Sequence, residues 1–387
     1  MSKRIIDPKI LIGILISILF LYLAFYGLPL KQIYEELLRI QVVWLIPLII
    51  LNILSMILRS YRWRLFFSGN RPPLRDTFCA TMIGYMANNV LPARIGEFVR
   101  AYVLSRRSAL SASKSMATIV AERVFDVISV LLVFGLYMIY SLLLPASQRI
   151  EIPPSLRIGS TVSLAIGLAA LLVMALLRAA PNIICGWVDR SLGCAHRLIA
   201  GHQPKPGSFR SQLARIVGEN VRRRIHRMIL SFIGGLSILG SARDILEATV
   251  WSFVNWAGLI LGLVFSFKAF NFPLSFSAAV FLIFVMALGV SVPSGPGSIG
   301  TFHGISMFGL WILKIEPEAA RAAYAIIVHA CSYIPVTLIG LGYMIREGMS
   351  FHELRKHSAH VTGQPDPASE SPVQSDPSNT ECPPCDP

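Results

Sequence analysis

Charged side chains are scarce in this sequence. Asp, Glu, Lys and Arg make up only 14% of its 387 residues, against about a quarter in soluble globular proteins. Hydrophobic residues make up 54%, and the mean hydropathy is +0.61. The composition excludes a water-soluble enzyme and indicates an integral membrane protein.

Acidic residues are scarcer than basic ones, with 21 Asp and Glu against 35 Lys and Arg, which gives a net charge of +14. Such an excess is typical either of nucleic-acid-binding proteins or of the cytoplasmic loops of membrane proteins. The basic residues here alternate with apolar runs. We therefore expect no nucleic-acid partner.

Cysteine is also rare, with six residues that indicate no extracellular disulfide framework. The terminal Cys382 and Cys385 provide two thiols, fewer than the four ligands of a structural zinc site. No Walker-type phosphate-binding motif occurs. We expect no metal, no cofactor and no catalytic residue set.

Long uncharged runs dominate the chain. A helix needs about 20 apolar residues to cross a bilayer, and six runs meet this length: 10–30, 40–58, 127–148, 158–177, 248–267 and 322–345. The first is too long for a signal peptide and is expected to be retained. Two further runs, 77–93 and 269–313, contain proline breaks, so we expect re-entrant hairpins. The predicted fold is an all-α integral membrane protein with six spanning helices and two hairpins, or about eight spans by hydropathy.

Two passages, which begin at Pro73 and Pro273, resemble each other. Both open with Pro-Leu, continue as an apolar run, break at proline and then show Ile-Gly-x-Phe. The distribution of Lys and Arg places both termini in the cytoplasm, so one hairpin enters from each side. This pattern predicts an inverted repeat, in which broken helices of the two halves meet near the bilayer midplane, as in transporters.

The repeat predicts the organisation of the chain. We expect a membrane domain over residues 1–347, with a first repeat at about 10–140 and a second at about 158–345. A basic cytoplasmic loop, residues 178–245, interrupts the second repeat. Residues 348–387 are rich in Pro and Ser and are expected to be a disordered cytoplasmic tail.

The first hairpin carries polar residues that hydrocarbon does not tolerate unpaired. Asn88 and Asn89 precede its break, and Arg94, Glu97 and Arg100 follow it. Arg94 and Glu97 are three apart and pair on a helix, which leaves Arg100 for an anion. The alternative is a cytoplasmic turn with solvated charges.

A second polar cluster, Glu122, Arg123 and Asp126, stands at the expected cytoplasmic start of the third span. Three interpretations stay open: ion pairs with Arg94 or Arg100, a proton site, and simple interfacial charges. Further upstream, Arg59 and Arg62 share one helix face. They serve either as an interfacial anchor or as ligands of a lipid phosphate.

The break in the second half contains no charged residue. Its glycines leave the backbone uncovered, so that backbone N–H groups can approach an anion closely. His303 follows this break and His329 lies inside the last run. For both histidines, a hydrogen-bonded core group and a titrating group are open alternatives. The backbone candidates are Pro293, Gly295, Gly297 and Gly300.

Four motifs, NNVLPARIGEFVRAYVL, ATIVAERVFD, VPSGPGSIGTFH and VHACSYIPVTLIGL, occur in this order. Together they resemble the membrane domain of the lysylphosphatidylglycerol synthase family, also called the flippase-like domain family, over nearly all of residues 8–347. The resemblance implies a multi-pass protein of the bacterial inner membrane, with Arg94, Glu97, Arg100 and the Glu122 cluster as its polar core. Many relatives have Glu where this chain has His303.

The resemblance also implies movement of lipids or lipid-linked sugars between leaflets. We expect a transporter of an anionic phospholipid or polyprenyl-linked lipid, with Arg94 and Arg100 on its phosphate. The full synthases carry a further aminoacyl-transferase domain, so lysyl transfer is not expected. A lipid-headgroup transferase that uses Glu122 or Asp126 as base is one alternative. A scaffold for a lipid or glycan synthase is another, and a homodimer stays open.

Overall fold

The computed structural model describes residues 22, 27, 30–67, 69–91, 95–143, 150, 153–180, 190, 230–290, 296–351, 353 and 354. Several predictions therefore lie outside the described residues. These are the first span, most of the basic loop, the tail from residue 355, Arg94, Pro293 and Gly295.

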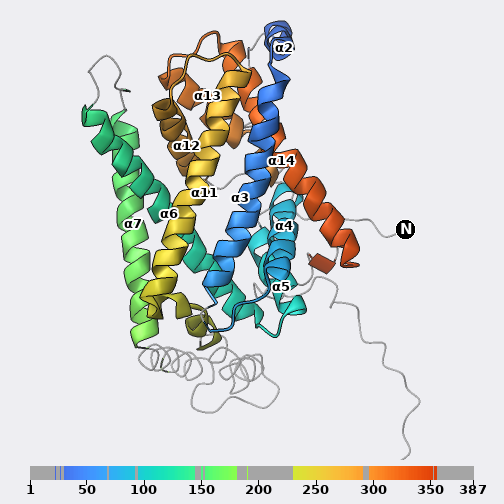
Figure 1. Ribbon diagram of the computed structural model, residues 1–387, viewed down its shortest axis with the longest axis vertical. Helices are drawn as coiled ribbons and strands as arrows, with labels where there is room; N and C mark the ends of the chain where they lie inside the picture. The colour runs from blue at the N-terminus through green and yellow to red at the C-terminus, as the bar shows by residue number, and fades with distance from the viewer. Residues whose placement is uncertain are drawn as a thin grey trace, which may run out of the picture.

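The described residues are helical and contain no strand (Figure 1). Five helices are long and apolar enough to span a membrane: α3 (Leu45–Leu65), α6 (Ala112–Leu143), α7 (Pro154–Ala179), α11 (Ala242–Ala269) and α14 (Glu318–Arg346). They overlap the five predicted runs that fall within the described part of the chain. Large apolar side chains on them, such as Leu136 and Leu172, are exposed, as lipid-facing residues are.

Both predicted breaks are present. The first hairpin consists of α4 (Leu74–Val90) and α5 (Gly96–Arg107), and the second of α12 (Phe276–Val290) and α13 (Thr301–Ile312). The two helices of each hairpin pack against each other. Helix α4 follows Pro73, whose φ of −56° suits a helix start. Gly300, the N-cap of α13, has φ +88°, a conformation that favours glycine.

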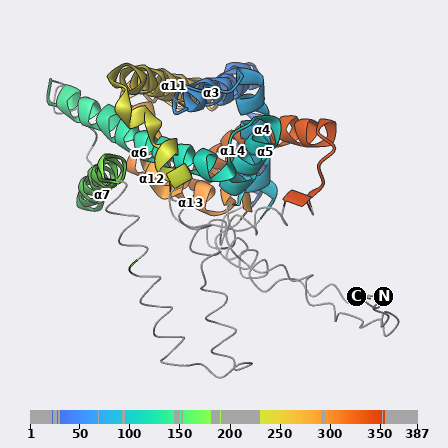
Figure 2. The ribbon, with the colours of Figure 1, turned by 90° about the horizontal axis from the view of Figure 1, so that it is seen from below.

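The helix contacts repeat when the halves are exchanged. Helix α4 packs on α14 as α12 packs on α6, α5 packs on α6 as α13 packs on α14, and α3 packs on α11 (Figure 2). In Figure 1 the first hairpin lies toward one end of the bundle and the second toward the other. This is the arrangement of an inverted repeat.

Short elements complete the described fold. Helix α2 (Leu30–Leu38) packs on α14, as α7 packs on α6. The 3₁₀ turn η1 (Val42–Trp44) leads into α3, η4 (Ser237–Gly240) precedes α11, and η5 (Pro296–Ser298) precedes α13. Turn η5 contacts α4, so the breaks of the two hairpins lie beside each other.

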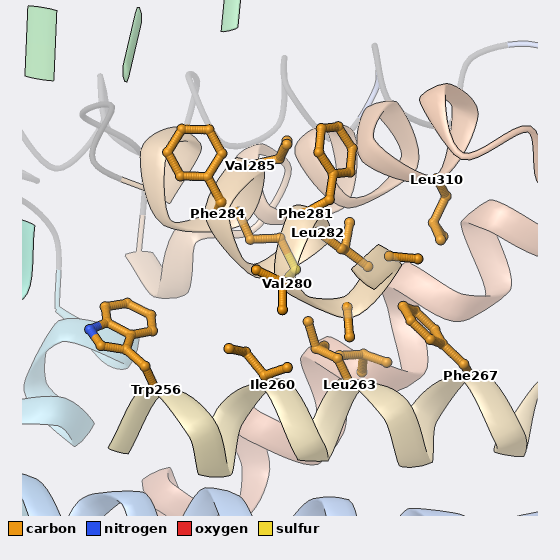
Figure 3. Packing of buried hydrophobic residues seen from close by; sticks show 14 of the residues in the cluster. Trp256, Ile260, Leu263, Phe267, Val280, Phe281, Leu282, Phe284, Val285 and Leu310 are labelled. Atoms are coloured by element: carbon orange, nitrogen blue, oxygen red, sulfur yellow. The ribbon is translucent and has the colours of Figure 1, made fainter. Parts of the chain in front are cut away.

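The second hairpin is embedded in apolar side chains. Trp256, Ile260, Leu263 and Phe267 of α11 face the side chains of α12 (Figure 3). On the other side, Phe284 of α12 stacks on Phe134 of α6. No residue of α12 or α13 is Asp, Glu, Lys or Arg. The helices of the second hairpin therefore contribute no Asp, Glu, Lys or Arg side chain to the bundle.

One predicted boundary is wrong. The third span was expected at residues 127–148, with Glu122 at its cytoplasmic start, but α6 begins at Ala112. Glu122 lies ten residues further on, about 15 Å along the helix axis. The prediction placed the start of this helix too late, because a search for uncharged runs ends at every ionic residue and the first part of α6 carries charged side chains.

Candidate functional site

A network of buried charges joins helices α3, α5 and α6. Arg62 is 1% exposed, Arg100 is 2% exposed and Glu122 is fully buried. An unpaired charge at such a site would be strongly destabilising, so each group needs a partner. The partners come from different helices, so they meet only when the three helices pack together.

Glu122 is the centre of this network. Its Oε1 accepts a hydrogen bond from Arg62 Nη2 at 3.0 Å, and its Oε2 accepts one from Arg100 Nη1 at 2.7 Å. Arg100 also lies over the ring of Trp63, 3.8 Å from the ring centroid, and Arg62 donates to Ser252 at 2.8 Å. One carboxylate thus holds two guanidinium groups from different helices.

Asp126, one turn further along α6, faces three arginines. Its carboxylate oxygens lie 2.6 Å from Arg62 Nη2, 3.5 Å from Arg59 Nη1 and 3.7 Å from Arg123 Nη1. Arg59 and Arg123 also donate to the hydroxyl of Tyr85, at 3.1 Å and 3.3 Å. The first hairpin therefore contributes Tyr85 from α4 as well as Arg100 from α5.

The network carries an excess of positive charge. Its described members are four arginines and three carboxylates, which leaves one guanidinium charge unbalanced. Arg100 Nε and Nη2 are buried and have no hydrogen-bond acceptor among the described residues. These donors suit an anion. The members are Arg59, Arg62, Glu97, Arg100, Glu122, Arg123 and Asp126.

The structure shows which of the expected ion pairs form. The pair of Glu122 with Arg100 is confirmed, whereas the expectation that Arg100 is unpaired is wrong, because α6 brings Glu122 against it. Glu97 lies 3.8 Å from Arg123, and its expected partner Arg94 lies outside the described residues. Sequence reasoning missed Tyr85, although a tyrosine in the apolar run before a break was a usable signal.

The two breaks meet beside α14. Tyr333 donates from its hydroxyl to the carbonyl of Asn89 at 3.1 Å, and Asn89 Nδ2 donates to Thr337 Oγ1 at 2.8 Å. A Cβ atom at Gly297 would lie 2.5 Å from the Tyr333 ring, so only glycine fits there. Asn88 acts locally, since its Oδ1 accepts a hydrogen bond from Gly96 N at 2.8 Å.

His303 and His329 interact with backbone groups of the second break. His303 Nδ1 accepts a hydrogen bond from Gly300 N at 3.3 Å, and His329 Nε2 lies 3.0 Å from the carbonyl oxygen of Gly297. Their ring centroids are 4.8 Å apart. These bonds favour the hydrogen-bonded interpretation of His329. Within the described part of the chain, no group of three or more His, Cys, Asp or Glu residues fits a metal ion.

These features define a multi-pass membrane protein whose broken helices, one from each inverted half, meet inside the bundle. The family-level comparison agrees with this class. The chain belongs to the family described as the lysylphosphatidylglycerol synthase transmembrane region, whose sequence model matches residues 10–340. The resemblance drawn from the four motifs is therefore confirmed.

Three relatives come from archaea. The chain is 22% identical over 332 residues to a UPF0104 membrane protein of Methanothermobacter thermautotrophicus, covering 83% of this chain and 90% of that protein. It is 30% identical over 135 residues to UPF0104 membrane protein MJ1595 of Methanocaldococcus jannaschii, covering 34% and 40%. It is 24% identical over 334 residues to Glycosyltransferase AglD of Haloferax volcanii, covering 81% of this chain and half of that protein. No solved structure matches the chain.

Proposed function

We propose that the protein moves an anionic lipid, either a phospholipid or a lipid-linked glycan, between the leaflets of its membrane. The observation that carries this proposal is the buried network with one excess positive charge beside the broken first hairpin. A phosphate that enters the membrane core needs fixed donors in place of water. Arg100, with two buried N–H groups free of partners among the described residues, provides them.

In the proposed mechanism, the lipid phosphate binds at Arg100 and its chains stay in the bilayer. Arginine suits this role because its guanidinium is planar, permanently charged and able to bind phosphate through two parallel hydrogen bonds. Arg59 and Arg62 contribute further positive charge to the buried network, and Arg94 remains a predicted ligand. Rocking of one repeat against the other then exposes the phosphate to either leaflet.

A headgroup transferase is the weaker alternative. A general base needs a carboxylate oxygen directed at substrate, but Glu122 and Asp126 both face arginines. The relative named Glycosyltransferase AglD aligns with this chain over only half of its own length. A scaffold that recruits a synthase through the basic loop makes a different demand, since Arg100 would then be dispensable.

Leaflet transfer in proteoliposomes tests the proposal. Fluorescent phosphatidylglycerol and a fluorescent polyprenyl phosphate serve as probes, with Arg100→Gln beside the wild type. Arg39→Gln is the control, because the side chain of Arg39 is 71% exposed and lies outside the network. We expect transfer by the wild type and the control, and at least about a tenfold loss in Arg100→Gln, because a hydrogen bond from a charged group is worth about 1.5–3 kcal/mol. Equal rates in all three would refute the phosphate site.

A further inference from the structure

Two of the contacts between the halves are equivalent to each other under exchange of the repeats. The first hairpin packs on α14 of the second half, and the second hairpin packs on α6 of the first half. In a symmetric molecule both contacts would be equally close. They are not equally close here, and the difference indicates which state of the protein the structure represents.

The contact between the first hairpin and α14 is closed. Gly340 of α14 lies against the backbone of α4, so that a Cβ atom there would overlap the Met82 carbonyl oxygen and the Met86 side chain. Beyond it, Met344, Met349 and Leu354 are buried in the apolar cluster of the first hairpin. The end of α14 therefore has no free space on this side.

Ion pairs fasten the same contact at its rim. Arg107 of α5 pairs with Asp76 of α4 at 2.7 Å and also with Glu347 just after α14. Arg106 pairs with Glu353 at 2.7 Å. Burial lowers the pKa of the Arg107 guanidinium, but its hydrogen bonds to Asp76 and Glu347 outweigh burial and raise that pKa. We call these two ion pairs, Arg106–Glu353 and Arg107–Glu347, the clamp.

The equivalent contact at the other end is only partly closed, because Phe134 of α6 stacks on Phe284 of α12 but a cavity separates the end of α6 from the second hairpin. A cavity of about 1520 Å³ lies between α6, α11 and the second hairpin, lined by Leu136, Tyr140 and Trp311 among others. Within the described part of the chain, no ion pair joins α6 to the second hairpin.

We infer that the clamp is a closed gate and that the structure is the state open toward the second hairpin. This inference rests on the proposed transport function. Exchange of the two repeats gives the alternative state, in which α6 closes the cavity and α14 swings away from α4. The clamp suits a gate because the Arg106–Glu353 pair is exposed, and such pairs contribute little to stability. Arg107 also keeps its pair with Asp76 when it separates from Glu347.

Paired spin-label distances test the gate in the full-length protein in lipid nanodiscs. One pair, Ala109 and Ile345, spans the closed contact, and the other, Leu143 and Phe308, spans the partly closed one. The variant Glu347→Gln with Glu353→Gln removes the acidic partners and keeps the Arg107–Asp76 pair within the first hairpin. Glu316→Gln is the control, because it removes an ion pair of 2.9 Å to Arg321 inside the second half.

In the double variant we expect the first distance to lengthen and the second to shorten, each by on the order of 5 Å, as in other packed-helix transitions. The control should keep both wild-type distances. Unchanged distances in the double variant, or a change of both in the same direction, would overturn the gate. The lipid-transfer assay tests the proposed function separately from the gate. If the two distances change in opposite directions but the wild type transfers no lipid, the gate is supported and transport of the lipids tried is refuted.

Discussion

Glu122 of α6 and Arg100 of α5 are joined by a hydrogen bond of 2.7 Å while both side chains are buried. This bond links the first hairpin to the spanning helix that follows it. It also turns Arg100 so that Nη1 binds Glu122 and Nη2 has no acceptor among the described residues. The same residue is thus an anchor of the fold and the main candidate for contact with a substrate.

Loss of the Glu122 charge should destabilise the protein strongly. Glu122→Gln leaves Arg62 and Arg100 without their shared carboxylate, and removal of one partner from a buried ion pair costs about 3–5 kcal/mol. Thermal unfolding in detergent, followed by fluorescence, measures the loss. Glu318→Gln is the control, since that side chain is 57% exposed. A similar unfolding temperature for both variants would contradict the network.

The cap of α13 should accept glutamate in place of His303. In a capping box, a side chain at the third helical position accepts a hydrogen bond from the N-cap backbone N–H, and glutamate is the usual residue. His303 does this for Gly300. We expect His303→Glu to keep wild-type stability and His303→Leu to lose about 1 kcal/mol. Equal losses in both would show that the imidazole has another role.

The hydrogen bond between Tyr333 and Asn89 should matter for communication between the halves. Tyr333→Phe removes the hydroxyl that reaches the end of α4, and a lost hydrogen bond of this kind costs about 1 kcal/mol. We expect a lower transfer rate with a small loss in unfolding temperature. Tyr343→Phe, on the same helix, is the control, because that hydroxyl has no hydrogen-bond partner within the described chain. A transfer rate equal to the control would argue against this coupling.

Gly340 of α14, which lies against α4, and Gly135 of α6, which faces open space, should respond differently to alanine. Gly340→Ala places a methyl group against α4, and overpacking of this kind costs about 1–3 kcal/mol. Gly135→Ala adds a methyl group to open space and should leave the unfolding temperature unchanged or slightly raised. Circular dichroism melts of the two variants test this difference. Equal destabilisation would contradict the close packing of α14 on α4 at Gly340.

The sequence predicted the helical elements well because their signals are local. The length of an apolar run sets whether a helix crosses the bilayer, and proline and glycine set where it breaks. The five runs within the described residues, both hairpins and the inverted order were therefore predictable. The pair of Glu122 with Arg100 was one of three open interpretations, since two carboxylates four residues apart need cations nearby.

Only the tertiary structure decided which side chains meet across helices. The partners of Arg59 and Arg62 on α6, the position of Tyr85 and the stacking of Arg100 on Trp63 depend on the rotation of each packed helix. The close contact at Gly340 and the cavity beside the end of α6 depend on how the two halves pack together. The repeated sequence predicts equivalent contacts at the two ends, and only the packing of the two halves makes them different.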